Sequence, residues 1–129
     1  MKEVHPKEFE QVVALPAPDR YEHFINTVAD WEEAWGLYED GWLMAVDDDG
    51  NRLLPLWPAK AYADACASGE WSGYEARLIS TSDLLAELLP NTERDGVLIA
   101  VFSTPEGNYI DVPSAQLRED LASACEEYE

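Results

Sequence analysis

The sequence predicts an α+β fold: a single domain over residues 1–129 in which helices pack on a mostly antiparallel sheet. The chain has 129 residues, a common size for one domain, and its 47% of hydrophobic residues suffice for one core. Segments of helical periodicity alternate with short β-rich runs that end in Asp-Gly or proline turns. The chain contains no linker, repeat or low-complexity tract that would divide it into further domains.

Two helices are expected first. Residues 5–15 favour a short helix that Pro16 and Pro18 end, so residues 1–18 form an N-terminal helical extension. Asp19 can then cap a second helix. The apolar face of that second helix consists of Tyr21, Phe24, Ile25, Val28 and Trp31.

A β-hairpin and a small-residue helix follow. In "MAVDDDGNRLLPLW" an Asp-Gly pair at 49–50 supplies a turn between two apolar flanks, after extended segments at 36–38 and 41–46. The second strand ends at Trp57, because Pro58 disfavours helix before it and suits a helix's first turn. Trp57 is therefore expected to be structural and largely buried. The following helix has one face of mostly small residues, Ala59, Tyr62, Ala63, Cys66 and Ala67, with Gly69 as its left-handed cap and Trp71 as an anchor.

The C-terminal half repeats strand and helix. Residues 76–79 favour a short strand, and Ser80 with Asp83 fits a capping box that opens a helix stopping at Pro90. The uninterrupted run at 97–102 predicts a central strand buried on both faces. After a turn and the strand "YIDV", a last helix begins at Pro113 or Ser114, with an apolar face of Leu117, Leu121, Ala124, Cys125 and Tyr128.

Charge is the strongest compositional signal. The formal net charge is −19, against the 2–8 units, roughly, that are usual for a small domain. Such a surface repels phosphate backbones and anionic membranes, so neither nucleic acid nor a membrane is expected as partner, whereas a basic protein is attracted. The chain has no apolar run near the roughly 20 residues of a membrane helix and no signal-peptide core at its start, which predicts a cytoplasmic location. Adaptation of the whole surface to salt is an alternative explanation of the acidity.

The sequence offers no catalytic motif, and we expect neither an enzyme nor a cofactor. The glycine-rich, nucleophile-elbow and phosphate-loop patterns are all missing. Cys66 and Cys125 form no C-x-x-C pair and are expected to be reduced, buried thiols. An EF-hand register that places Gly50 at position 6 puts Ala45 and Leu56 at positions 1 and 12, so both key ligands are lacking and no metal site is expected. The aspartates at 47–49 are then solvated turn carboxylates.

What remains is a binding surface between residues 30 and 50. This stretch interleaves carboxylates with aromatic residues and contains no lysine or arginine. Tyrosine and tryptophan are frequent interface anchors, and carboxylates at a rim steer a cationic partner. Alternatively, the aromatic residues belong to the core and the acidic ones are merely solvated. The candidate binding residues are Trp31, Glu32, Glu33, Trp35, Tyr38, Glu39, Asp40, Trp42, Asp47, Asp48 and Asp49.

The chain also resembles a small bacterial family, domain of unknown function 2750. The similarity runs in order from residue 20 to residue 121 and is most specific at "LPLWP". Its pieces are Arg20-Tyr21 with Phe24, Val28-Ala29-Asp30, Trp35-Gly36-Leu37, Asp40-Gly41-Trp42, Pro55 with Trp57-Pro58, Gly69 with Trp71, Leu89-Pro90, Asp95-Gly96 and Val101-Phe102. The resemblance implies a compact cytosolic α+β domain and assigns no catalytic residue.

Two functions compete at this point. Small acidic proteins of this kind resemble immunity proteins, which inhibit secreted toxins that are often basic nucleases; a basic toxin domain is then the expected partner. That step is an analogy, because a fold or family does not define a function. The alternative is a cytosolic housekeeping adaptor or small-ligand-binding domain.

Overall fold

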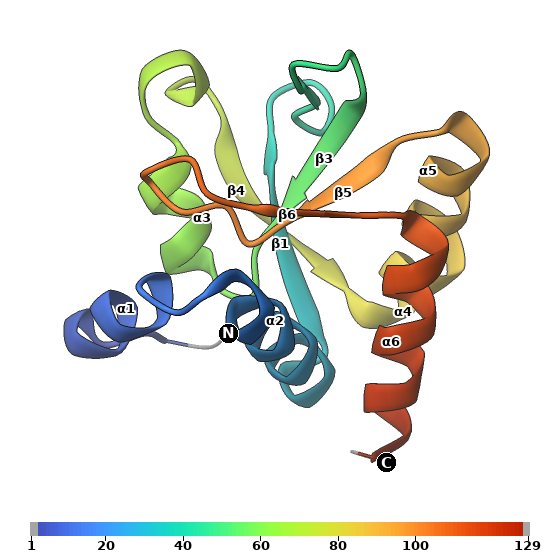
Figure 1. The fold of residues 1–129 in the computed structure, drawn as a ribbon, viewed down its shortest axis with the longest axis horizontal. Helices are drawn as coiled ribbons and strands as arrows, with labels where there is room; N and C mark the ends of the chain where they lie inside the picture. Colours follow the sequence, from blue (N-terminus) through green and yellow to red (C-terminus); the bar gives the residue numbers. More distant parts are fainter. Residues whose placement is uncertain (1–2, 128–129) are drawn as a thin grey trace.

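The computed structural model describes residues 3–127 and confirms the α+β class (Figure 1). None of the helices within that range is both long and apolar enough to span a membrane. In chain order the elements are α1 (Pro6–Val13), α2 (Ala17–Trp31), β1 (Glu33–Tyr38), β2 (Ala45–Val46), β3 (Arg52–Leu56), α3 (Lys60–Cys66), η1 (Gly69–Trp71), β4 (Glu75–Ser80), α4 (Thr81–Asp83), η2 (Leu84–Leu88), α5 (Leu89–Asp95), β5 (Leu98–Val101), β6 (Ile110–Val112) and α6 (Ser114–Glu127).

The strands form two sheets instead of one. β1 and β4 pair antiparallel, while the second sheet has the order β2-β3-β5-β6. Its β3–β5 pair is parallel, because a long crossover through α3, β4 and the helices of residues 81–95 connects the two strands. The backbones of Trp35 and Trp57 exchange two hydrogen bonds of 2.9 and 2.8 Å and thereby join the sheets.

The four-stranded sheet has two different faces. Its inner face carries Leu54, Leu56, Ile99 and Val101, each at most 1% exposed, within the main hydrophobic core. The core also includes buried residues of α2 and α6, which pack on each other. The predicted central strand at 97–102 is confirmed, since β5 lies between β3 and β6. Alternate strand residues point to the opposite, outer face, which is described below as the floor of a pocket.

Trp57 is structural, as predicted. Its side chain is 0% exposed, and its indole N–H donates a 2.9 Å hydrogen bond to the Ser103 carbonyl. The expected hairpin is also confirmed, with Ala45 paired to Leu53 across the turn. Of the predicted face of the last helix, three members are buried, Cys125 is half-buried, and Tyr128 lies outside the described residues.

Several predicted element boundaries were wrong. Pro16, not Asp19, precedes the first residue of α2, although Asp19 still places a negative charge in the first turn, which favours a helix. α3 begins at Lys60 with Ala59 as its N-cap, so Pro58 belongs to the connection. Gly69 has the expected left-handed conformation but opens η1, because α3 has already ended at Cys66.

The helix after β4 does not stop at Pro90. Its predicted start is confirmed, since the Asp83 N–H donates to the Ser80 hydroxyl at 3.1 Å. The helix then widens into the π-helical turn η2, in which the Leu89 N–H donates to the Leu84 carbonyl. Pro90 therefore sits in the first turn of α5, where its missing N–H costs little, and the helix continues until Gly96 ends it in a left-handed conformation.

Candidate functional site

The structure divides the predicted binding segment between the two ends of β1. Trp31 and Glu32 lie where α2 meets the start of this strand, at the bottom of Figure 1. The loop after Tyr38 and the β2–β3 hairpin lie together at the top. Five steps of roughly 3.3 Å separate the first and last residues of β1, a distance of about 17 Å. The candidate residues therefore belong to two surfaces, not one.

At the first end the aromatic and acidic residues differ in exposure. Trp31 is 46% exposed and Glu32 is exposed, but Glu33 and Trp35 are buried at 7% and 6%. These two residues lie in β1, which is flanked by β4 and bridged to the strand end at Trp57. Their interpretation as surface binding residues is thus corrected, because the chain itself already covers both side chains.

At the other end the two aromatic residues pack on the domain itself. Tyr38 and Trp42 are half-buried and form an edge-to-face pair with ring centroids 5.2 Å apart. The Arg77 guanidinium lies 3.6 Å from the Tyr38 centroid. The Trp42 ring covers Gly36 so closely that a Cβ there would lie 2.9 Å from its Cζ3 atom. Both aromatic residues therefore stabilise the β1–β4 sheet.

The three aspartates of the hairpin are not equivalent. The Asp47 carboxylate accepts hydrogen bonds from the backbone N–H groups of Asn51 (2.8 Å) and Asp49 (3.0 Å) and from the Asn51 side-chain amide (3.1 Å). These bonds, led by those from Asn51, lower the pKa of Asp47. Asp48 and Asp49 are exposed. Asp47 therefore has a role that the sequence analysis did not assign, since its exposed carboxylate also builds the turn.

The outer face of the four-stranded sheet carries a pocket that the sequence did not predict. We call it the sheet pocket; its volume is about 280 Å³. The floor consists of Ala45, Leu53, Pro55 and Ala100, which pair across strands on one face. The remaining lining residues come from β2, the end of α3, η1 and the loop before β6, and are Val46, Cys66, Ser68, Trp71, Ser103, Thr104, Pro105, Gly107 and Tyr109.

The back wall of the sheet pocket is held by buried hydrogen bonds. The Ser103 carbonyl accepts from the indole N–H of Trp57 at 2.9 Å and from the Cys66 thiol at 3.4 Å. Phe102 has a left-handed φ of +54°, which is uncommon for a bulky residue. Its N–H donates to the Leu56 carbonyl at 2.9 Å, and its ring packs on Tyr62 with centroids 4.7 Å apart. These contacts determine where the loop that forms the pocket wall leaves the sheet.

The surroundings of Cys66 disfavour the thiolate form of its side chain. Burial raises the pKa of its thiol to about 11, although the neighbouring Trp57 indole N–H acts in the opposite direction. At neutral pH the group is therefore a protonated thiol, which reacts slowly with electrophiles. In residues 3–127 no group of three or more histidine, cysteine, aspartate or glutamate side chains is arranged to hold a metal ion.

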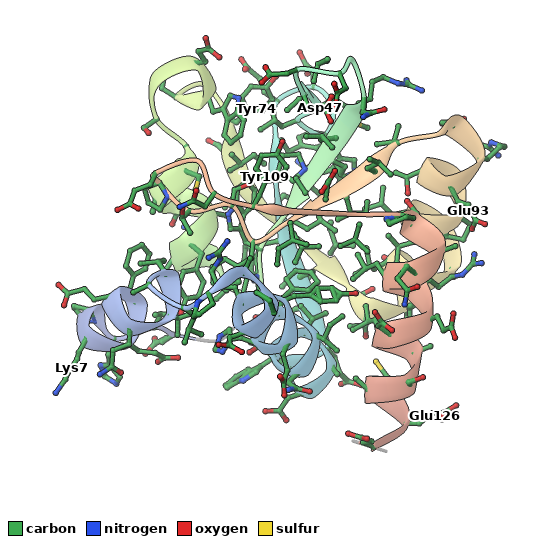
Figure 2. All side chains as sticks on the ribbon, in the orientation of Figure 1. Lys7, Asp47, Tyr74, Glu93, Tyr109 and Glu126 are labelled. Carbon is green, nitrogen blue, oxygen red and sulfur yellow. The ribbon has the colours of Figure 1, made fainter. Side chains whose placement is uncertain are left out.

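The mouth of the sheet pocket is both apolar and negatively charged. Tyr109 and Val46 are 39% and 66% exposed, and Figure 2 shows Tyr109 in the same half of the molecule as Asp47. Partial burial raises the pKa of Tyr109, and the carboxylates of Asp47, Asp111 and Asp48 raise it further. The Tyr109 hydroxyl thus lies in the negative field of three carboxylates.

Sequence reasoning missed Trp71, Tyr109 and Asp111 as site residues. Trp71 and Tyr109 lie outside the β-strands in connecting segments, where partly exposed aromatic residues often contact a ligand. That signal was present in the sequence. For Asp111 the sequence contained no such signal, because its position beside Ala100 depends on the pairing of β6 with β5.

Comparisons with known proteins supply a family but no activity. Residues 21–121 match the model of a family described as protein of unknown function, DUF2750. No curated protein and no solved structure matches the chain. The match leaves out α1, the first four residues of α2 and the part of α6 after residue 121. It includes each of the strands β1 to β6 and all the lining residues of the sheet pocket.

Proposed function

The chain belongs to the DUF2750 family, and we propose that it is a non-catalytic, cytosolic binding module that holds a basic protein through one end of the molecule. We call this surface the acidic end and define it by the exposed carboxylates of Glu39, Asp40, Asp48 and Asp49. Both of its loops lie at the top of Figure 1. Ala45 and Val46, which precede the hairpin tip, line the sheet pocket.

One observation carries the proposal: within the described part of the chain, no basic side chain forms an ion pair with these carboxylates. Two arginines on the neighbouring strands are engaged within the domain, since Arg52 donates to the Asp95 carbonyl and Arg77 lies over a tyrosine ring. A concentrated, unneutralised negative patch raises the association rate of a cationic protein.

Exposed apolar side chains support a protein as the partner. Met44 and Val46 are 46% and 66% exposed and precede the hairpin tip, and Tyr109 lies at the pocket mouth. Apolar side chains surrounded by charged ones are typical of a protein-binding surface. By analogy with immunity proteins, the basic partner is a toxin domain that this protein inhibits. The second candidate is a small-ligand-binding domain, and the existence of the sheet pocket favours it.

The test is association kinetics with a purified basic protein, captured from the native host, across a salt series. The double variant Asp48→Lys/Asp49→Lys reverses the hairpin tip and spares Asp47. Its control is Glu119→Lys/Glu126→Lys on α6, which changes the net charge equally; Figure 2 shows Glu126 far from Asp47. We expect a steep salt dependence and a several-fold larger loss of association rate in the hairpin variant than in the control.

Two results would contradict the proposal. Equal losses in both double variants would mean that total charge, not the acidic end, steers association. Failure to recover any basic partner would favour salt adaptation as the origin of the acidity and would put the small-ligand function first.

A further inference from the structure

The interior and the mouth of the sheet pocket differ in chemistry, and this difference restricts what can enter. The floor of Ala45, Leu53, Pro55 and Ala100 offers no polar side-chain atom. At the back wall the Cys66 thiol and the Trp57 indole both donate to the Ser103 carbonyl, and the Thr104 hydroxyl accepts from the Asn108 N–H at 3.2 Å. A group that needs several hydrogen bonds, such as a sugar or a phosphate, would find no polar side chain at this floor to replace the bonds that it makes with water.

A cationic head group is equally unsuited to the interior. The carboxylates that influence Tyr109 belong to the hairpin and to β6, outside the lining of the pocket. A lysine or arginine that entered the pocket would bring its charge to the apolar floor and leave its apolar stem at the acidic mouth. The reverse arrangement suits both regions: an apolar group inside and cations outside.

From this arrangement we propose that the sheet pocket binds one apolar side chain of a partner segment, and that lysine or arginine residues flanking that side chain contact the carboxylates at the mouth. The inference rests on the proposed function. It specifies the segment of the partner that binds: a basic segment with an aromatic or aliphatic residue at its centre. A cavity of about 280 Å³ bordered by Trp71 and Tyr109 suits one such anchor. A second copy of this chain is a poor occupant, because two molecules of net charge −19 repel each other.

The probe is a pentapeptide with a central phenylalanine and two lysines on each side. One control peptide has serine at the centre, and another keeps the phenylalanine but has glutamates at the flanks. We expect the first peptide to bind at least about tenfold more tightly than either control, because only it satisfies both the interior and the mouth.

Two readouts locate the peptide on the protein. The variant Ser68→Phe fills the pocket from an exposed lining position and should abolish the preference for phenylalanine over serine while leaving the urea midpoint unchanged. Amide chemical shifts on the unmodified protein should move at Gly107 and Tyr109 and stay constant at Glu126. The shift measurement keeps the test valid if Ser68→Phe folds poorly.

The outcomes separate this inference from the proposed function. If the lysine peptides bind with strong salt dependence but equally for phenylalanine and serine, the pocket assignment is overturned and the acidic end stands. If the glutamate-flanked peptide binds as well as the lysine-flanked one, the role of the mouth carboxylates is overturned. If no basic protein and no lysine peptide binds, both proposals fail. If the protein is a dimer that Ser68→Phe dissociates, a second copy occupies the pocket and the inference is wrong.

Discussion

Removal of the Trp57 side chain should be among the most destabilising single changes in this domain. The indole is fully buried and supplies one of two hydrogen bonds to the Ser103 carbonyl. Replacement of a buried tryptophan by alanine costs about 3–5 kcal/mol, from lost burial and the cavity left behind. The free energy of unfolding of a domain is about 5–15 kcal/mol in total, so Trp57→Ala should lose a large part of the stability of the protein. The backbone hydrogen bonds to Trp35 do not depend on this side chain and should survive.

Trp57→Phe divides that loss into packing and hydrogen bonding. Phenylalanine retains most of the apolar surface but lacks the indole N–H, which leaves the Ser103 carbonyl with the weaker thiol donor of Cys66 at 3.4 Å. The expected cost is about 1–3 kcal/mol. Trp31→Ala is the matched control, because that ring is 46% exposed, and it should cost less than about 1.5 kcal/mol.

The measurement is urea unfolding followed by far-UV circular dichroism, with midpoints and slopes compared across the three variants. The expected order of destabilisation is Trp57→Ala, then Trp57→Phe, then Trp31→Ala. A loss below about 1 kcal/mol in Trp57→Ala would refute the reasoning, since it would mean that the indole is not part of the core.

Three further predictions concern single side chains. In the variant Cys125→Ser, whose only thiol is Cys66, a thiol reagent should react slowly at pH 7 and at an unfolded-protein rate in urea, because Cys66 is buried and burial raises its pKa; rapid labelling of this folded variant would contradict this. Asp47→Ala should lower the urea midpoint, whereas Asp48→Ala should not. The pKa of Asp47 is depressed by folding, so this difference should be present above about pH 4 and disappear as the pH falls through the folded-state pKa; a constant difference from pH 7 to pH 2 would count against it. Gly36→Ala should displace the Trp42 ring and lower stability, and an unchanged melt together with an unchanged ring environment by NMR would show that the space is sufficient.

Features that depend on neighbouring residues could be derived from the sequence. Ser80 caps its helix because the hydroxyl needs only the N–H three residues ahead. The hairpin at 47–51 forms because aspartate and glycine favour the turn between two apolar flanks. Local patterning also predicted the burial of Trp57, since a leucine-rich strand leads into it and Pro58 ends that strand.

Predictions failed where an unusual helical turn or a contact distant in the sequence outweighed a local preference. Pro90 was expected to end a helix, but the π-helical turn before it removes the need for its N–H. Glu33 and Trp35 lie in a segment whose composition suits a surface, yet both are buried in a strand that pairs with β4 and that Trp35 bridges to Trp57. The parallel pairing of β3 with β5 joins segments more than forty residues apart, and no short pattern encodes it.

The sequence by itself determined the α+β class and the net charge of −19. The net charge in turn determines that a partner attracted by it must be positively charged. Only the tertiary structure decided that the carboxylates divide between two ends of β1, that Asp47 holds a turn while Asp48 faces solvent, and that an apolar pocket opens beside them. The physical reason is range. Charge and periodicity are properties of single residues and their near neighbours, whereas a pocket floored by Ala45 and Ala100 exists only after β3 has paired with both neighbouring strands.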